Sequence, residues 1–246
     1  MSMNKRDAIK AQRTKKKRQR RISTLIGVGI FILIVIAVII TPTIINALKP
    51  AGSFVQITPV AYPLENGKAV GNPNAKVKIQ VFEDFQCTSC KTYVDNIEKQ
   101  LLASSYVADG QIYYEIMQWP FIDTNSLSKE SHQAANASMC ANEQSKFWPY
   151  HDILYANQGV ENGGSFNDKR LVAFAQSLGL DMTQFNQCFN SNKYKTEIDN
   201  EYQEGVTLGV TGTPSLFLNG KAVTPGFVPT YDELKSAIDT ALATGG

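Results

Sequence analysis

The stretch VKIQVFEDFQCTSCKTYVDNIEKQL, residues 77–101, holds two of the chain's four cysteines and decides the fold. Its first part, residues 77–85, alternates in polarity and is apolar enough for a buried strand. From Cys90 to Leu101, apolar residues recur at steps of three and four positions, which predicts one face of a helix. Cys87 and Cys90 therefore lie where a strand turns into a helix.

A second strand follows this helix. A turn around residues 108–110 precedes QIYYEIMQW, residues 111–119, which is rich in aromatic and β-branched residues. Strand, helix and strand in this order form a βαβ unit. The two strands should therefore be parallel and joined by a right-handed crossover.

The rest of the chain is helical before it returns to strand. Residues 126–207 have a helical pattern, in about five short segments. Apolar residues return at 215–218, and the Asn219-Gly220 pair that follows is the strongest short signal for a β-hairpin. An amphipathic helix is expected over residues 230–243.

This order of elements predicts a thioredoxin-like α/β fold. Its core comes in two parts, residues 76–125 and 208–246, which we expect to share one sheet. The helical segments between them, residues 126–207, form an inserted helical domain. A single N-terminal transmembrane helix precedes the fold, for the following reasons.

The N-terminal end differs in charge from the rest of the chain. Residues 1–21 carry ten Lys or Arg and one acid, which leaves 14 bases and 21 acids for all later residues. The formal net charge of +2 thus combines a strongly basic end with a body of net charge −7. An acidic body is a poor surface for nucleic acid, and we expect no nucleic-acid partner.

An uncharged run of 27 residues, 22–48, follows the basic segment. About 20 apolar residues span a bilayer as a helix, whereas a cleavable signal peptide has an apolar region of only about 7–15 residues. We therefore predict a transmembrane signal-anchor in the cell membrane. Basic residues 1–21 stay in the cytoplasm, and the chain from Lys49 onward lies outside it. Residues 49–75, rich in Pro, Gly and Asn, are expected to be a tether.

Three roles are open to Cys87 and Cys90 in this extracytoplasmic compartment, where disulfides persist. A helix N-terminus favours thiolate, so a cysteine there with a second one three residues on suits a redox couple. A structural zinc site needs four ligands, and His132 and His151 lie far downstream, so no metal is expected. A purely structural disulfide between Cys87 and Cys90 would close a ring too small to contribute much to the stability of the fold. The redox couple is favoured.

Three motifs resemble those of the DsbA-like thioredoxin superfamily. They are FEDFQCTSC (82–90), ANASMCANEQSKFWPYHDILYANQ (135–158) and GVTGTPSLFLNGK (209–221). The chain looks most similar to the membrane-anchored or secreted bacterial thiol-disulfide oxidoreductases of the BdbD-like group. The resemblance covers about residues 70–243.

The resemblance implies a role for each motif. Cys87 would be the nucleophile and Cys90 the resolving cysteine. The Thr213-Pro214 bond would be cis, with Pro214 packed against the CTSC loop. The backbone of Thr213 would then be free to pair with an extended substrate segment.

Four neighbours of the couple are further candidates. Thr88 and Ser89 occupy the positions where DsbA-like oxidases commonly carry Pro-His, and they can donate hydrogen bonds toward the sulfur but bring no charge. Glu83 and Asp84 can relay protons to Cys90. By strand alternation only one of these acids should face inward; the alternative is that both end the strand at the solvent.

The remaining cysteines, Cys140 and Cys188, lie in the helical block. Free cysteines are often small buried hydrophobes, but the resemblance implies a structural Cys140–Cys188 disulfide, which members of the group often have. His132 and His151 are expected to be packing and hydrogen-bonding residues rather than partners of Cys87.

Together these features predict a membrane-tethered extracytoplasmic oxidoreductase without a cofactor. It would introduce disulfides into exported proteins with cysteine pairs. A membrane partner of the DsbB or vitamin K epoxide reductase type would reoxidise it. Run in reverse, the same site would make a reductase or isomerase. A non-enzymatic tethered adaptor or chaperone-like binding module is the other alternative.

Overall fold

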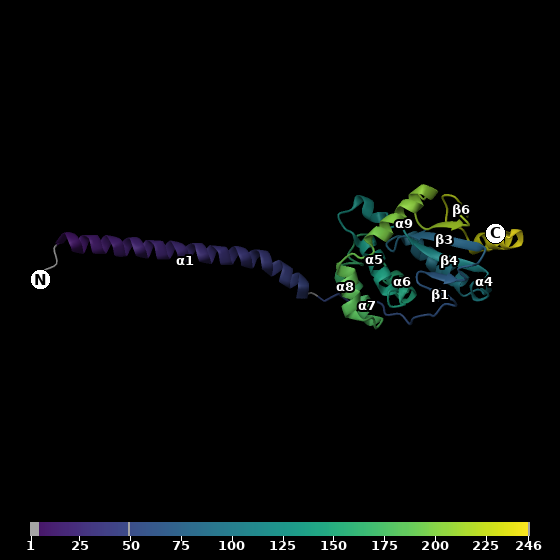
Figure 1. Ribbon diagram of the computed structural model, residues 1–246, viewed down its shortest axis with the longest axis horizontal. Helices are drawn as coiled ribbons and strands as arrows, with labels where there is room; N and C mark the ends of the chain where they lie inside the picture. Colours follow the sequence, from purple (N-terminus) through teal and green to yellow (C-terminus); the bar gives the residue numbers. More distant parts are fainter. Residues whose placement is uncertain (1–4, 49, 246) are drawn as a thin grey trace. The chain divides into compact units, whose positions relative to one another are not determined.

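The computed structural model describes residues 5–48 and 50–245 and divides into two compact units, residues 1–50 and 51–246 (Figure 1). Three parts of the expected segments lie outside the described residues: the first four positions of the basic segment, Lys49 at the start of the expected tether, and Gly246.

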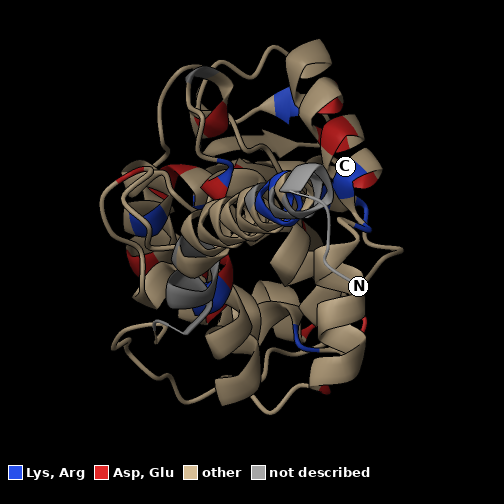
Figure 2. Ribbon diagram, turned by 90° about the vertical axis from the view of Figure 1, so that its left-hand side faces the viewer, with Lys and Arg blue, Asp and Glu red and all other residues tan. Residues whose placement is uncertain are grey.

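The first unit consists of one long helix, α1, Lys5–Leu48. Its basic residues gather in its N-terminal part, and a run without charged residues follows (Figure 2). The stretch Arg13–Thr41 is long and apolar enough to cross a membrane. By length and composition, α1 is therefore a candidate for the single membrane span.

The second unit is built on a sheet whose described strands follow the order β1-β2-β4-β3-β5-β6. The central strands β3, Val77–Glu83, and β4, Ile112–Gln118, run parallel. On its other side β3 pairs antiparallel with β5, Ser215–Leu218. The predicted βαβ unit is confirmed, and the cysteine loop follows directly from the end of β3.

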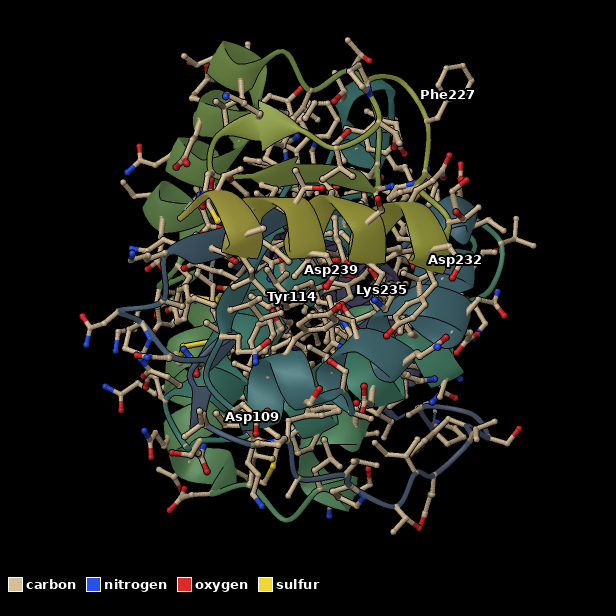
Figure 3. The ribbon with its side chains drawn as sticks, turned by 90° about the vertical axis from the view of Figure 1, so that its right-hand side faces the viewer. Asp109, Tyr114, Phe227, Asp232, Lys235 and Asp239 are labelled. Carbon is tan, nitrogen blue, oxygen red and sulfur yellow. A yellow bond between two sulfur atoms is a disulfide. The ribbon has the colours of Figure 1, made fainter. Side chains whose placement is uncertain are left out.

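The C-terminal elements also form as predicted. Asn219 and Gly220 both have positive φ, 49° and 76°, as a tight hairpin turn requires, and they connect β5 to β6, Lys221–Ala222. The last helix, α10, Tyr231–Thr244, begins at a capping box on Thr230. It lies across one face of the sheet (Figure 3).

The helix after the cysteines is less regular than its sequence period predicts. It runs as α2, Thr88–Tyr93, then a π-helical turn η1, Val94–Glu98, then α3, Lys99–Leu102, and α4, Ser105–Ala108, follows. A π-helical turn widens the helix locally and is common at functional sites. It carries the buried Glu98.

Between β4 and β5 the chain forms a 3₁₀ turn and a run of helices that share one core with the sheet. These are η2 Ile122–Asn125, α5 Glu130–Asn142, α6 Phe147–Ala156, α7 Asp168–Ser177, α8 Met182–Asn190 and α9 Lys195–Leu208. The side chain of Trp148 on α6 packs against Tyr114 on β4, with ring centroids 6.4 Å apart. The inserted helices therefore complete the core.

The opposite face of the sheet has its own apolar cluster. Phe82, Met117 and Trp119 are buried there. Helix α9 packs on this face, where Tyr202 stacks on Trp119 with ring centroids 4.9 Å apart. Because both faces are covered, β3 is buried along most of its length.

Part of the expected tether, residues 49–75, forms strands of the sheet in the structure. Residues Glu65–Asn66 and Ala69–Gly71 form β1 and β2, and β2 pairs antiparallel with β4. Val70 is fully buried, and the Lys68 ammonium lies within ion-pair distance of carboxylates on β4 and α9. Strands of two and three residues are too short to show an alternating pattern, so their sequence resembles a linker.

The Cys140–Cys188 disulfide links α5 to α8 across a sequence separation of 48 residues. In the chain-entropy view, a loop of this length stabilises the folded state by about 4 kcal/mol. We therefore expect the Cys140→Ala/Cys188→Ala double variant to lose about 4 kcal/mol of unfolding free energy, measured by urea unfolding of the detergent-solubilised chain. A loss below about 1 kcal/mol would contradict a structural role for this bond.

Candidate active site

Cys87 occupies the N-cap of α2, directly after the loop that leaves β3. Its backbone is extended, with φ −72° and ψ 120°, and its N–H donates to the carbonyl of Asp84. The side chain keeps 7% of its surface exposed, whereas Cys90, one turn further on, is fully buried. Both thiols are free in this structure. Both cysteines are therefore buried, and Cys87 is the less buried of the two.

The second wall of the site comes from the start of β5. Because Ser215 pairs with Phe82, the two preceding residues, Thr213 and Pro214, project beyond the end of β3 toward the cysteine loop. The Thr213-Pro214 bond is cis. The Cys87 thiol donates to the Thr213 carbonyl across 3.2 Å. Two segments 126 residues apart in the sequence therefore meet at one sulfur.

The two cysteines differ strongly in acidity. A hydrogen bond with the Cys90 thiol lowers the pKa of Cys87 to about 6; burial acts against it, and hydrogen bonds with the side chain of Thr213 and with the backbone N–H groups of Cys90 and Ser89 add to the lowering. Burial raises the pKa of Cys90 well above its usual value, and Cys87 and the charge of Glu83 raise it further. Cys87 is thus a thiolate at neutral pH and Cys90 a thiol.

Thr88 and Ser89, the residues between the cysteines, are both exposed. Ser89 acts on Cys87 through its backbone N–H. The Thr88 carbonyl accepts a hydrogen bond from the Thr92 hydroxyl within the first helical turn. The low pKa of Cys87 therefore comes from the helix start and from Cys90.

Both acids that precede the loop are buried, which corrects the expectation that only one would face inward. Glu83 is 2% exposed and Asp84 is 1% exposed. Strand β3 ends at Glu83, so the chain turns at Asp84 and the alternation rule no longer applies there. The inserted helices cover this end of the strand and shield both side chains from water.

Asp84 faces the loops rather than the cysteines. Its carboxylate accepts hydrogen bonds from the backbone N–H groups of Gln86 and Ile122 and from the Ser131 hydroxyl at 2.7 Å. Burial raises its pKa to about 6, although these three hydrogen bonds lower it. Asp84 thus ties the cysteine loop to η2 and α5.

Glu83 faces the opposite way, into the interior behind Cys90. Its Oε2 atom accepts a hydrogen bond from the Tyr155 hydroxyl at 2.9 Å and lies 3.6 Å from Nε2 of His151. Glu98 approaches the same nitrogen, with Oε1 3.5 Å from Nε2. His151 was expected only to pack and form hydrogen bonds; the structure places it between two buried carboxylates.

Glu83, Glu98 and His151 each offer one atom that could ligate a metal ion, and these three atoms lie within 4.8 Å of one another. Each carboxylate already accepts a tyrosine hydroxyl, from Tyr155 and Tyr114 respectively. The imidazole is also protonated at neutral pH, because Glu98, Asp152 and Glu83 outweigh burial and raise the pKa of His151 to about 10. We therefore describe this group as an ion-paired cluster.

The cysteine loop is also contacted by a residue that the sequence did not single out. Gln158, just after α6, donates from Nε2 to the carbonyls of Phe85 and Cys87 at 2.7 and 2.9 Å. Nothing in its sequence context distinguishes it from an ordinary polar residue at a helix end. The other histidine, His132 on α5, pairs with Asp123 at 2.8 Å.

Comparison with known proteins agrees with this geometry. A thioredoxin family model matches residues 64–240. The chain belongs to the thioredoxin family. The match includes β1 and β2 as well as the inserted helices, so the whole of the sheet described above belongs to the family fold.

Among the relatives are proteins of the expected DsbA-like kind. The "Probable disulfide bond formation protein D" of Bacillus anthracis is 28% identical over 87% of this chain and 93% of its own length. A crystal structure of a thioredoxin-like oxidoreductase from Silicibacter pomeroyi is 26% identical, with a TM-score of 0.57 over 70% of this chain and 90% of that one. BdbD from Bacillus subtilis, 19% identical, shares the fold with a TM-score of 0.62, over 76% and 100% of the two chains.

The acidity of Cys87 gives a direct test of the site. In the reduced chain, alkylation of Cys87 by iodoacetamide should rise with pH around a midpoint of about 6. Replacing Cys90 with Ala should move that midpoint upward, because it removes the hydrogen bond that does most to lower the pKa. Peptide mass spectrometry identifies the modified residue, with Cys87→Ala as the control. A wild-type midpoint near 8.5, the usual value for cysteine, would contradict the geometry.

Proposed function

We propose that this chain is a membrane-tethered thiol-disulfide oxidoreductase that introduces disulfides into exported proteins through a Cys87–Cys90 redox couple. One observation supports it above all others: an acidic Cys87 that is 7% exposed and a fully buried, weakly acidic Cys90 lie at the start of one helix. Thiol-disulfide exchange needs these two roles, an accessible sulfur for substrate and a protected partner.

In the oxidising direction, a substrate thiolate attacks the Cys87 sulfur of the Cys87–Cys90 disulfide. The bond between the cysteines breaks, a mixed disulfide forms, and the electron pair goes to the Cys90 sulfur, which takes up a proton. A second substrate thiolate then attacks the substrate sulfur of the mixed disulfide. Cys87 leaves as a thiolate, so the substrate loses two electrons and the couple gains them.

The acidity of Cys87 favours the oxidising direction over the reducing one. A thiol of low pKa is a good leaving group, and a stabilised thiolate stabilises the reduced form of the couple. The pKa of Cys87, lowered to about 6, lies below the usual value of about 8.5 for cysteine. The reductase and isomerase alternatives use the same residues with the opposite preference.

We assign substrate contact to the segment before β5. Thr213 lies beside the Cys87 sulfur, and the chain bends there before it enters β5 at Ser215. An extended substrate segment can pair with this segment, and its cysteine then lies next to Cys87. Main-chain pairing is independent of side-chain identity, which suits an enzyme that acts on many unfolded chains.

Proton exchange with Cys90 is assigned to Glu83. Its charge acts on the Cys90 thiol, and it is fully enclosed with it. Asp84 is excluded from this role because its carboxylate is engaged by loop hydrogen bonds. Cys140 and Cys188 have a structural role in this proposal.

We assign the site to the extracytoplasmic side of the cell membrane. The apolar stretch of α1 would span the bilayer once, and the basic residues that precede it would stay in the cytoplasm. Each oxidation of substrate leaves the couple reduced, so a second protein has to reoxidise it. A membrane partner of the DsbB or vitamin K epoxide reductase type would meet this need.

The Cys90→Ala variant tests the proposed function. It should accumulate mixed disulfides between Cys87 and exported proteins, because the resolving thiol is absent. The measurement is non-reducing electrophoresis of membranes after acid quenching, with Cys87→Ala as the matched control. Adducts no more abundant than in the control would refute the oxidoreductase proposal. Binding of unfolded chains that survives the loss of both cysteines would support the adaptor alternative.

A further inference from the structure

The turn that follows α6 contacts the cysteine loop at three consecutive residues. Gln158 donates from Nε2 to the carbonyls of Phe85 and Cys87, at 2.7 and 2.9 Å. The backbone N–H of Asn162 donates to Oε1 of Gln86 at 2.6 Å. The loop between β3 and α2 is therefore held by residues that come 71 to 76 positions later in the chain.

Among these contacts, the one with the Cys87 carbonyl bears most directly on the start of α2. This carbonyl also accepts the backbone N–H of Lys91 at 3.2 Å, which closes the first turn of the helix. Gln158 fixes the same carbonyl from outside the helix. Because the peptide group is planar, fixing the carbonyl fixes the direction in which the first turn of α2 begins. The N–H groups of that turn are the ones that form hydrogen bonds with the Cys87 sulfur.

Gln158 is an uncharged residue, and both hydrogen bonds that its amide donates go to backbone carbonyls. Hydrogen bonds with Cys90 and Thr213 and with the N–H groups at the start of α2 lower the pKa of Cys87. Gln158 therefore acts on the acidity of Cys87 through the placement of the backbone rather than through charge.

Asn157, the neighbour of Gln158, is fixed in turn by a residue from the segment that precedes the sheet. Its Oδ1 atom accepts the backbone N–H of Val55 at 2.7 Å, and its Nδ2 atom donates to the Val55 carbonyl at 2.8 Å. The second Nδ2 hydrogen goes to the Ile153 carbonyl within α6. One buried side chain thus pairs with both backbone groups of Val55, as a residue of a neighbouring strand would.

The segment that holds Asn157, residues 53–62, is docked on the inserted helices near both of its ends. Phe54 packs edge-on against Phe174 on α7, with ring centroids 5.1 Å apart. Tyr62 packs edge-on against Trp148 on α6, with ring centroids 5.4 Å apart. The segment runs beside these two helices before it reaches β1 (Figure 1). It was expected to be part of a tether, and we call it the docked segment.

We propose that Gln158 is a positioning residue that holds the backbone of Cys87 at the start of α2, and that the docked segment holds Gln158 in place through Asn157. This inference rests on the proposed function, because the sulfur that is positioned is the one that substrate attacks. Two adjacent side chains after α6 divide the task, since one binds the cysteine loop and the other binds the docked segment. The chain between α1 and the sheet therefore supports the active site as well as linking the two units.

Gln158→Met keeps the length of the side chain and removes its amide. In the reduced full chain, the pH midpoint of Cys87 alkylation should rise by about one pH unit, because the first turn of α2 no longer keeps its N–H groups on the sulfur. Gln144→Met is the matched control and should leave the midpoint unchanged. Gln144 lies just after α5, and its amide likewise donates to a backbone carbonyl, that of Asp181 at 3.1 Å. A wild-type midpoint in Gln158→Met would overturn the proposal.

Val55→Pro tests the docked segment. Proline has no backbone N–H, so this variant loses the hydrogen bond to Oδ1 of Asn157. Val55→Ala keeps that N–H and is the matched control, since the Val55 side chain is 58% exposed. We expect the alkylation midpoint to rise in Val55→Pro, by less than in Gln158→Met, and to stay at the wild-type value in Val55→Ala. An unchanged midpoint in Val55→Pro would overturn the proposal even if Gln158→Met does not fold.

The double variant Val55→Pro/Gln158→Met distinguishes one shared route from two separate effects. If the docked segment acts through Gln158, the double variant has the same midpoint as Gln158→Met alone. A larger rise would show that the segment acts by another route and would overturn the proposal. Urea unfolding of each variant separates a change in acidity from a loss of folding. The proposed function is tested separately, because an absence of adducts in Cys90→Ala would refute it whatever these midpoints are.

Discussion

The whole site depends on the difference in burial between two sulfurs one helical turn apart. Cys87 keeps a small opening to solvent at the helix N-terminus, and Cys90 has none. Burial makes the thiolate of Cys90 costly, and the hydrogen bond that Cys90 gives to Cys87 stabilises the thiolate there. In the proposed mechanism, this difference in burial decides which cysteine attacks, which one resolves the mixed disulfide, and the order in which they react.

The rest of the unit maintains this placement. Strand β3 brings the chain to the helix start, and β5 brings Thr213 back against the same sulfur. Tyr155 and His151, on the inserted helix α6, lie beside Glu83 at the end of β3. Gln158 donates hydrogen bonds to two carbonyls of the cysteine loop. Because these contacts come from the inserted helices and the residue after α6, the insertion contributes to the site as well as to the core.

Much of this was predictable because it depends on local sequence. The end of β3, the helix after Cys90 and the Asn219-Gly220 hairpin each follow from a period or a turn signal within a few residues. The joining of Cys140 to Cys188 and the cis bond before Pro214 came from the resemblance to a family, since no local pattern shows them. Both are present in the structure.

What could not be predicted depends on contacts between distant segments. Glu83 and Asp84 are adjacent in the sequence, and both are buried because the inserted helices cover the end of β3. His151 reaches Glu83 across 68 positions, and Glu98 reaches both through a π-helical turn that a sequence period does not reveal. Strand β2 is defined by its pairing with β4 and β1 by its pairing with β2, and their own residues resemble a linker.

The central claim is that the acidity of Cys87 makes this couple an oxidant. The measurement that tests it most directly is the reduction potential of the Cys87–Cys90 couple in the full chain, by equilibration with glutathione buffers. The account predicts a potential less negative than about −200 mV, toward the value of about −120 mV for DsbA. A potential near −270 mV, the approximate value for thioredoxin, would contradict it and indicate a reductase.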